Sequence, residues 1–251
     1  MRLQTYLTEK IDTDKLNTLV KIFSKIPSGK PEAISNFVVN SIKASGIKVK
    51  PKGGIYLSGP MTNLPDDNWP VFHHANKYLS GYVVNPGNPH GELLKKATKN
   101  FSWEDFMVED VYGMVDCDKI VFMPGYSKST GAIVEAMIGK KLMGAKTKTF
   151  REHIGKSKYE SFIEDVKNQY YKDGNPDAFH SVIEPMLRAK TEKEAASYVK
   201  QYIPSSKSET NESIISSTAD ILRYIKNWTL KEILKVIGMI LNKAGVRGLA
   251  W

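Results

Sequence analysis

The sequence predicts an α/β fold, with a parallel sheet, helices on both of its faces and helical extensions at both ends. Short apolar runs alternate with helical patterns over residues 53–150, which is typical of βαβ units. The strand patterns lie near 54–58, 82–85, 119–123 and 146–150, and the helical patterns near 68–80, 91–98, 102–116 and 130–143. Strand patterns stop after Phe150, and apolar residues recur at helical spacing on either side of the βαβ region.

Three regions follow from this change of pattern. We expect a helical lead-in over 1–52, an α/β domain over 53–150 and a helical C-terminal region over 151–251. The polar stretch 204–213 predicts a linker, and two helices are expected after it, over 214–227 and 229–244. The last helix carries an apolar stripe that packs either on the α/β core, the commoner case, or on a second copy of the chain. A homo-oligomer is therefore among the assemblies that we expect.

Composition restricts the class of protein. Of the 251 residues, 41% are hydrophobic and 25% are charged, which is ordinary for a soluble globular protein. No apolar run approaches the roughly 20 residues of a membrane span, and the first residues lack the apolar core of a secretory signal. The single cysteine, Cys117, excludes an intramolecular disulfide and a cysteine-based zinc site, and the histidines lack metal-ligand spacing. We expect a cytoplasmic protein with no membrane partner, no metal and no other cofactor.

The formal net charge of +9 raises the question of an anionic partner. Lysines are spread along the whole chain, and no run alternates basic with aromatic residues as in many single-strand binders. Solvated helix faces explain most of this charge. An anionic ligand or a weak association with nucleic acid remains as the alternative.

Two predicted strands end in small, polar residues suited to a ligand site. The run Ile55–Leu57 leads into a turn at Ser58, and the strand near 119–123 leads into a polar loop and then a helix. Because ligands bind at the carboxyl ends of parallel strands, we expect both loops to face one site. The expected ligand-binding residues are Tyr56, Ser58, Gly59, Pro60, Met61, Asn63, Asn85, Gly125, Ser127, Lys128, Ser129 and Gly131.

Two carboxylates are the candidates for catalysis. Glu135 is surrounded in sequence by apolar or tiny residues, so it is either a nucleophile or base in a desolvated site, or one partner of a buried ion pair. Lys140 and Lys141 lie too far round the helix to be favourable partners. Asp110 follows Met107 by three residues on the helix 102–116, and periodicity alone leaves open whether it faces the ligand edge or solvent.

The two loops also suit a phosphate group, because the second opens a helix whose N-terminus carries hydroxyls. Ser129 or Thr130 is equally well explained as a simple N-cap. Neither loop matches a Walker A motif or a dinucleotide fingerprint.

An ordered set of motifs resembles the nucleoside 2-deoxyribosyltransferase superfamily, in particular a phage-rich branch of uncharacterised deoxyribosyltransferase-like domains. The resemblance covers residues 54–150 and rests on Ile55–Thr62, Asn68–Phe72, Val84–Pro86, Met107–Asp110, Asp116–Val121, Pro124-Gly125, Gly131 and Glu135. It implies a flavodoxin-like sheet and cleavage of the N-glycosidic bond of nucleosides or nucleoside 5′-monophosphates. It further implies that Glu135 attacks the anomeric carbon, that Asp110 engages the base and assists its departure, and that Ser58–Asn63 holds sugar or phosphate.

One departure from the family pattern bears on the substrate. Transferases of free nucleosides carry an additional acid in the loop before the nucleophile helix, where this chain has Ser127, Lys128 and Ser129. A lysine with hydroxyls suits a 5′-phosphate, so we expect hydrolysis or base transfer on a (deoxy)nucleoside 5′-monophosphate. The alternative is a non-catalytic nucleotide-binding or phage virion-associated protein with the same fold. Met1–Glu9 has a short, weak similarity to the head-targeting leaders of phage internal proteins, so the virion is a second possible location beside the host cytoplasm.

Overall fold

The computed structural model describes residues 13–49, 51, 53–86 and 102–200. The expected helix near 91–98, the linker 204–213, the helices 214–227 and 229–244, and the leader-like Met1–Glu9 lie outside these residues. The chain divides into two compact units, and all of the described residues belong to the first.

The sheet has four parallel strands in the order β2-β1-β3-β4. The strands are β1 (Ile55–Ser58), β2 (Val83–Val84), β3 (Lys119–Phe122) and β4 (Lys146–Thr149). The register pairs Tyr56 with Ile120 across the two central strands. This order is that of the first four strands of a flavodoxin-like sheet, so the predicted α/β fold is confirmed.

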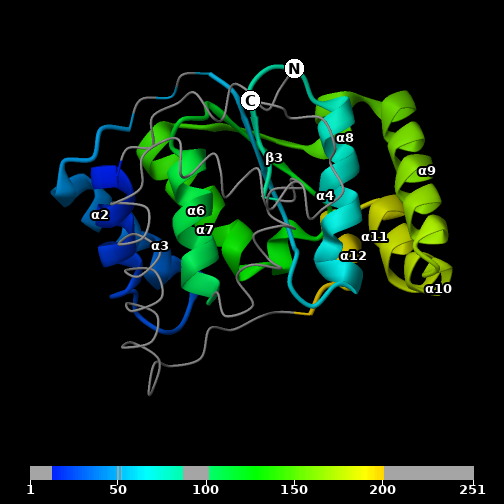
Figure 1. Cartoon of the computed structure of the whole chain (residues 1–251), viewed down its shortest axis with the longest axis horizontal. Helices are drawn as coiled ribbons and strands as arrows, with labels where there is room; N and C mark the ends of the chain where they lie inside the picture. Colours follow the sequence, from blue (N-terminus) through cyan, green and yellow to red (C-terminus); the bar gives the residue numbers. More distant parts are fainter. Residues whose placement is uncertain (1–12, 50, 52, 87–101, 201–251) are drawn as a thin grey trace, which may run out of the picture. The chain divides into compact units, whose positions relative to one another are not determined.

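Helices cover both faces of the sheet (Figure 1). One layer contains α2 (Thr13–Phe23), α3 (Pro31–Ser45), α6 (Trp103–Met114) and α7 (Thr130–Ile138). The other contains α4 (Trp69–Ala75), α8 (Phe150–Ile154), α9 (Lys156–Lys172), α10 (Pro176–Ala178), α11 (Glu184–Arg188) and α12 (Glu192–Ala196). The remaining turns are the 3₁₀ segments η1 (Pro65–Asn68), η2 (Asn76–Tyr78) and η3 (Tyr126–Lys128), and the π-helical segments η4 (Gly139–Met143) and η5 (Phe179–Ile183).

The strands separate two apolar cores because successive side chains point to opposite faces. Ile55 and Leu57 of β1 pack in the core beneath α4 and α9, whereas Tyr56 packs in the core beneath α6 and α7. All four residues of β1 are buried, as expected of a central parallel strand. Between β4 and residue 200 the described chain forms helices and loops, in agreement with the predicted change of pattern at Phe150. None of the described helices is both long and apolar enough to span a bilayer.

The lead-in helices form part of the core on the α6 and α7 face. Ile34, Val38 and Ile42 of α3 are almost completely buried and belong to the same apolar cluster as Tyr56 and Ile120. Pro31 occupies the first turn of α3, where its missing N–H removes no hydrogen bond, and Gly46 ends the helix with a left-handed φ of 75°. Residues 13–45 therefore cover one side of the sheet that carries the site.

Asp105 and Glu109 lie four residues apart on α6, one helical turn from each other. Glu109 is exposed, but Asp105 forms a capping box with Ser102, in which its carboxylate accepts hydrogen bonds of 2.9 Å from the Ser102 amide and hydroxyl. This cap fixes the first turn of the helix that carries Asp110.

Truncation of the buried face of α3 should therefore destabilise the whole α/β unit. We expect Ile34→Ala to lower the free energy of unfolding by about 2–5 kcal/mol, because it leaves a cavity in a closed core. Asn40→Ala, on the exposed side of the same helix, is the matched control and should change it by less than about 0.5 kcal/mol. Chemical denaturation measures both, and equal stability of the two variants would show that α3 is not part of the core.

Candidate active site

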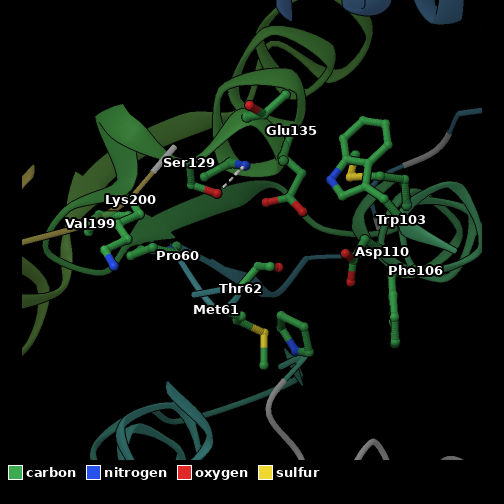
Figure 2. A pocket seen from close by; sticks show the side chains of 16 residues that line it. Pro60, Met61, Thr62, Trp103, Phe106, Asp110, Ser129, Glu135, Val199 and Lys200 are labelled. Atoms are coloured by element: carbon green, nitrogen blue, oxygen red, sulfur yellow. Dashed lines mark hydrogen bonds between the residues drawn. The ribbon is translucent and has the colours of Figure 1, made fainter. Parts of the chain in front are cut away.

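A cleft lies at the carboxyl ends of β1 and β3, between the loops that follow them and the start of α7 (Figure 2). It encloses about 650 Å³, including its solvent-filled mouth. Its lining consists of Gly59, Pro60, Met61, Thr62, Pro86, Trp103, Phe106, Met107, Asp110, Ser129, Thr130, Gly131, Ala132, Glu135, Val199 and Lys200. The cleft therefore has the position that an open parallel sheet favours for a ligand.

Glu135 lies on α7 at the floor of this cleft and is only 5% exposed. The Ser58 hydroxyl donates a 2.5 Å hydrogen bond to one carboxylate oxygen, and the Tyr56 hydroxyl donates a 2.9 Å hydrogen bond to the other. Ser58 and Tyr56 are two residues apart on β1, so their side chains share the face of the strand that α7 covers. Two buried hydroxyls thus compensate the burial of one carboxylate.

Asp110 lies on α6 and faces the same cleft, which answers the question that periodicity left open. Its carboxyl interacts with both Tyr56 and Glu135. The helix positions Trp103, Phe106 and Met107 of the lining are spaced at i, i+3 and i+4, and Asp110 follows at i+7. One face of α6 therefore forms a wall of the cleft.

The surroundings of the two carboxyls favour different protonation states. Burial raises the pKa of Asp110 well above its usual range, and the negative charge of Glu135 raises it further. Burial also raises the pKa of Glu135, but hydrogen bonds from Ser58, Tyr56 and Asp110 oppose this effect. The pair is best described as sharing one proton, with Asp110 as the acid and Glu135 as the carboxylate.

The loop after β1 is held in an unusual backbone conformation. Asn63, Asp66, Asp67 and Asn68 have left-handed φ angles of 66°, 51°, 48° and 60°, a region that non-glycine residues seldom occupy. The side-chain amide of Asn68 donates a 2.7 Å hydrogen bond to the carbonyl oxygen of Pro60 and thereby fixes the cleft-lining part of the loop. Backbone strain of this kind is typical of binding sites.

Gly59 starts this loop at a position that has no room for a side chain. A Cβ atom there would lie 2.7 Å from the Cβ of Met123 and 3.3 Å from the ring of Phe72. The glycine therefore permits the loop to approach the end of β3 closely enough to close the floor of the cleft.

The loop after β3 binds a carboxylate of the chain itself. The backbone N–H groups of Gly125 and Ser127 donate hydrogen bonds of 3.1 and 2.8 Å to the two carboxylate oxygens of Glu192. Ser129 caps α7 by accepting a 3.3 Å hydrogen bond from the Ala132 amide, and it also lines the cleft. Ser129 is therefore both the N-cap of α7 and a residue of the cleft lining.

The predicted site residues fall into three groups. Seven line the cleft: Gly59, Pro60, Met61, Asp110, Ser129, Gly131 and Glu135. Tyr56 and Ser58 lie behind it as hydrogen-bond donors to Glu135. Five do not line it: Asn63, Asn85, Gly125, Ser127 and Lys128.

Physical reasons account for these five exceptions. Asn63 and Lys128 are exposed beside the cleft. Asn85 is buried, and its amide donates a 2.7 Å hydrogen bond to the carbonyl oxygen of Phe72. Gly125 and Ser127 direct their amides to the Glu192 carboxylate. For these positions the pattern of strand ends predicted which segments lie near the cleft, but not whether their side chains and backbone amides point into it.

Several residues of the cleft lining were not predicted from the sequence. The i, i+3, i+7 spacing of Trp103, Phe106 and Asp110 was available in the sequence and predicts a shared helix face. Lys200 is one of three lysines between 186 and 200, and no local pattern distinguishes it. Among the residues that the structure describes, no group of three or more His, Cys, Asp and Glu side chains is arranged to hold a metal ion.

The fold and the site define an α/β domain with a carboxylate pair at its ligand edge. Comparison with family models places residues 54–147 in similarity to a family described as a domain of unknown function, DUF4406. This segment begins just before β1, ends within β4 and includes both Asp110 and Glu135, whereas Lys200 lies beyond it. No curated protein and no solved structure matches the chain.

The raised pKa of Asp110 has a consequence for stability. The folded protein holds the Asp110 proton to higher pH than the unfolded chain does. The stabilisation of the folded state by this proton is therefore fully present below the ordinary carboxyl pKa, and it is lost as the pH rises through the raised pKa. Asp110→Asn removes the ionisation, so its free energy of unfolding relative to the parent protein should increase from pH 4 towards pH 8. Chemical denaturation across this range measures the difference. Glu104→Gln, outside the cleft on the same helix, is the control, and a parallel pH dependence of Asp110→Asn and the parent would contradict the raised pKa.

Proposed function

We propose that the protein cleaves the N-glycosidic bond of a (deoxy)nucleoside 5′-monophosphate, by hydrolysis or by base transfer, through a covalent intermediate on Glu135. The observation that carries the proposal is the pairing of the buried Glu135 with the half-buried Asp110 in one cleft, where Glu135 accepts two hydroxyl hydrogen bonds and desolvation raises the pKa of Asp110. Glycosidic cleavage needs one carboxylate and one proton donor at the same bond, and this pair supplies both.

In the first step a Glu135 oxygen attacks the anomeric carbon of the sugar, and the bond from this carbon to the base nitrogen breaks. The base departs with the bonding electron pair and receives the Asp110 proton. In the second step water or a second base attacks the same carbon, the ester bond to Glu135 breaks, and the proton of the attacking group returns to Asp110. The hydroxyls of Tyr56 and Ser58 hold Glu135 in place and stabilise its charge when the ester is cleaved.

The walls of the cleft support a nucleotide as the ligand. Trp103 and Phe106 lie on the Asp110 side in Figure 2, and Phe106 is 39% exposed, so an aromatic surface is available where a base would meet the proton donor. Lys200 lies on the opposite side of Glu135 in the same view. An aromatic side, a central nucleophile and a cationic side match the order of base, sugar and phosphate in a nucleotide.

The resemblance to the nucleoside 2-deoxyribosyltransferase superfamily also supports the proposal. It rests on the segment that matches the family of unknown function, and it assigns the same two roles to Glu135 and Asp110. Burial and hydrogen bonding, which favour a proton on Asp110 and a charge on Glu135, support the same assignment.

Glu135→Gln should abolish base release, because an amide of the same shape is a poor nucleophile. We expect the rate to fall by about 10²-fold or more. Incubation with a panel of nucleoside monophosphates, followed by chromatography for free bases, measures the effect. Glu32→Gln, on the exposed side of α3, is the control. Retained activity in Glu135→Gln would return Glu135 to a structural role, whereas nucleotide binding without base release by the parent protein would favour the non-catalytic alternative.

Asp110→Asn should slow base release most for bases that are poor leaving groups, since these depend most on proton donation in the transition state. Rates for a series of bases with different basicity, plotted for the parent and for Asp110→Asn, measure this dependence. A steeper dependence in the variant is expected. Equal slowing of all bases would exclude proton donation by Asp110 and leave it a positioning role.

A further inference from the structure

The segment that follows α11 reaches the cleft although it lies about forty to fifty residues beyond β4, the last strand of the sheet. Glu192 begins α12, and Val199 and Lys200, which follow this helix, complete the cleft lining. Thr191 caps α12 by accepting a 3.2 Å hydrogen bond from the Glu194 amide. This cap fixes the first turn of α12.

Two contacts fix the segment to the loop after β3. The Glu192 carboxylate accepts hydrogen bonds from the amides of Gly125 and Ser127. Val199 is 5% exposed, and a Cβ atom at Gly125 would lie 2.6 Å from its Cγ2. Gly125, with φ of 84°, therefore allows an approach that no other residue would permit without a shift.

These contacts decide which groups remain for a phosphate. The amides of Gly125 and Ser127 are already engaged by a carboxylate, and Lys128 of the same loop does not line the cleft. Lys200 is the cationic side chain in the lining, and no acceptor for its ammonium group occurs in the part of the chain that the structure describes. Asp110 and Glu135 are the acids of this lining, on the other side from Lys200 in Figure 2.

We propose that Lys200 binds the 5′-phosphate of the substrate and makes the protein select nucleotides over nucleosides. This inference rests on the proposed function and assigns the phosphate contact to a segment outside the matched family region. Glu192 and Val199 are positioning residues, because they hold Lys200 at the cleft without contacting the substrate.

Binding measured by calorimetry tests the assignment. Glu135→Gln serves as the background so that ligands are not consumed, and the probes are the four deoxynucleoside 5′-monophosphates and the four deoxynucleosides, in moderate salt. For every monophosphate that binds, we expect an affinity about tenfold or more higher than that of the corresponding nucleoside, because one charge-assisted hydrogen bond is worth about this much. Lys200→Ala should weaken the monophosphate by about tenfold and the nucleoside by less than twofold. Lys200→Arg should retain most of the preference.

Lys193→Ala, an exposed lysine of α12 outside the cleft, is the matched control and should change neither affinity. A preference that persists in Lys200→Ala, or that is lost in Lys128→Ala instead, would overturn the assignment. Base release by the parent protein separates the two claims. If bases are released while Lys200→Ala retains the preference, only the phosphate assignment fails, and if no base is released from any probe, the proposed function itself fails.

Discussion

The site depends on one buried carboxylate, Glu135, and on the two hydroxyls that compensate its burial. An ionised carboxylate in an apolar core is strongly unfavourable unless it is hydrogen-bonded. Ser58 and Tyr56 supply these hydrogen bonds from a central strand whose four residues are all buried. The fold therefore maintains a charged group in a position where it is costly, which is typical of a functional site rather than of a stabilising interaction.

Asp110 adds a second unfavourable group beside the first. Two carboxyls at close range do not both ionise easily, and the surroundings assign the proton to Asp110, because the hydroxyl donors favour the charged form of Glu135. The capping box of Ser102 and Asp105 fixes the start of α6, and α2 packs along the same helix. The helices on this face of the sheet thus preserve the relative position of the two carboxyls.

The sequence predicted the sheet, its order of elements and the desolvated position of Glu135, because alternation of apolar runs and a lone acid among apolar residues are local signals. It predicted less well the contacts that tertiary packing decides. Lys128 was favoured as the phosphate ligand by its place in the loop, yet it does not line the cleft, whereas the equally exposed Lys200 enters the lining through the docking of α12. The Glu192 carboxylate on the amides of Gly125 and Ser127 has no signal in either segment alone.

The central claim is that Glu135 forms a covalent bond to the sugar. The most direct test is to mix the protein with a deoxynucleoside 5′-monophosphate that it cleaves, to quench the reaction rapidly with acid, and to measure the intact mass of the protein by mass spectrometry. The account predicts a mass increase equal to one deoxyribosyl phosphate, located by peptide mapping on Glu135 and absent from Glu135→Gln. Base release at full rate with no adduct on Glu135 at any quench time, together with undiminished release by Glu135→Gln, would contradict it.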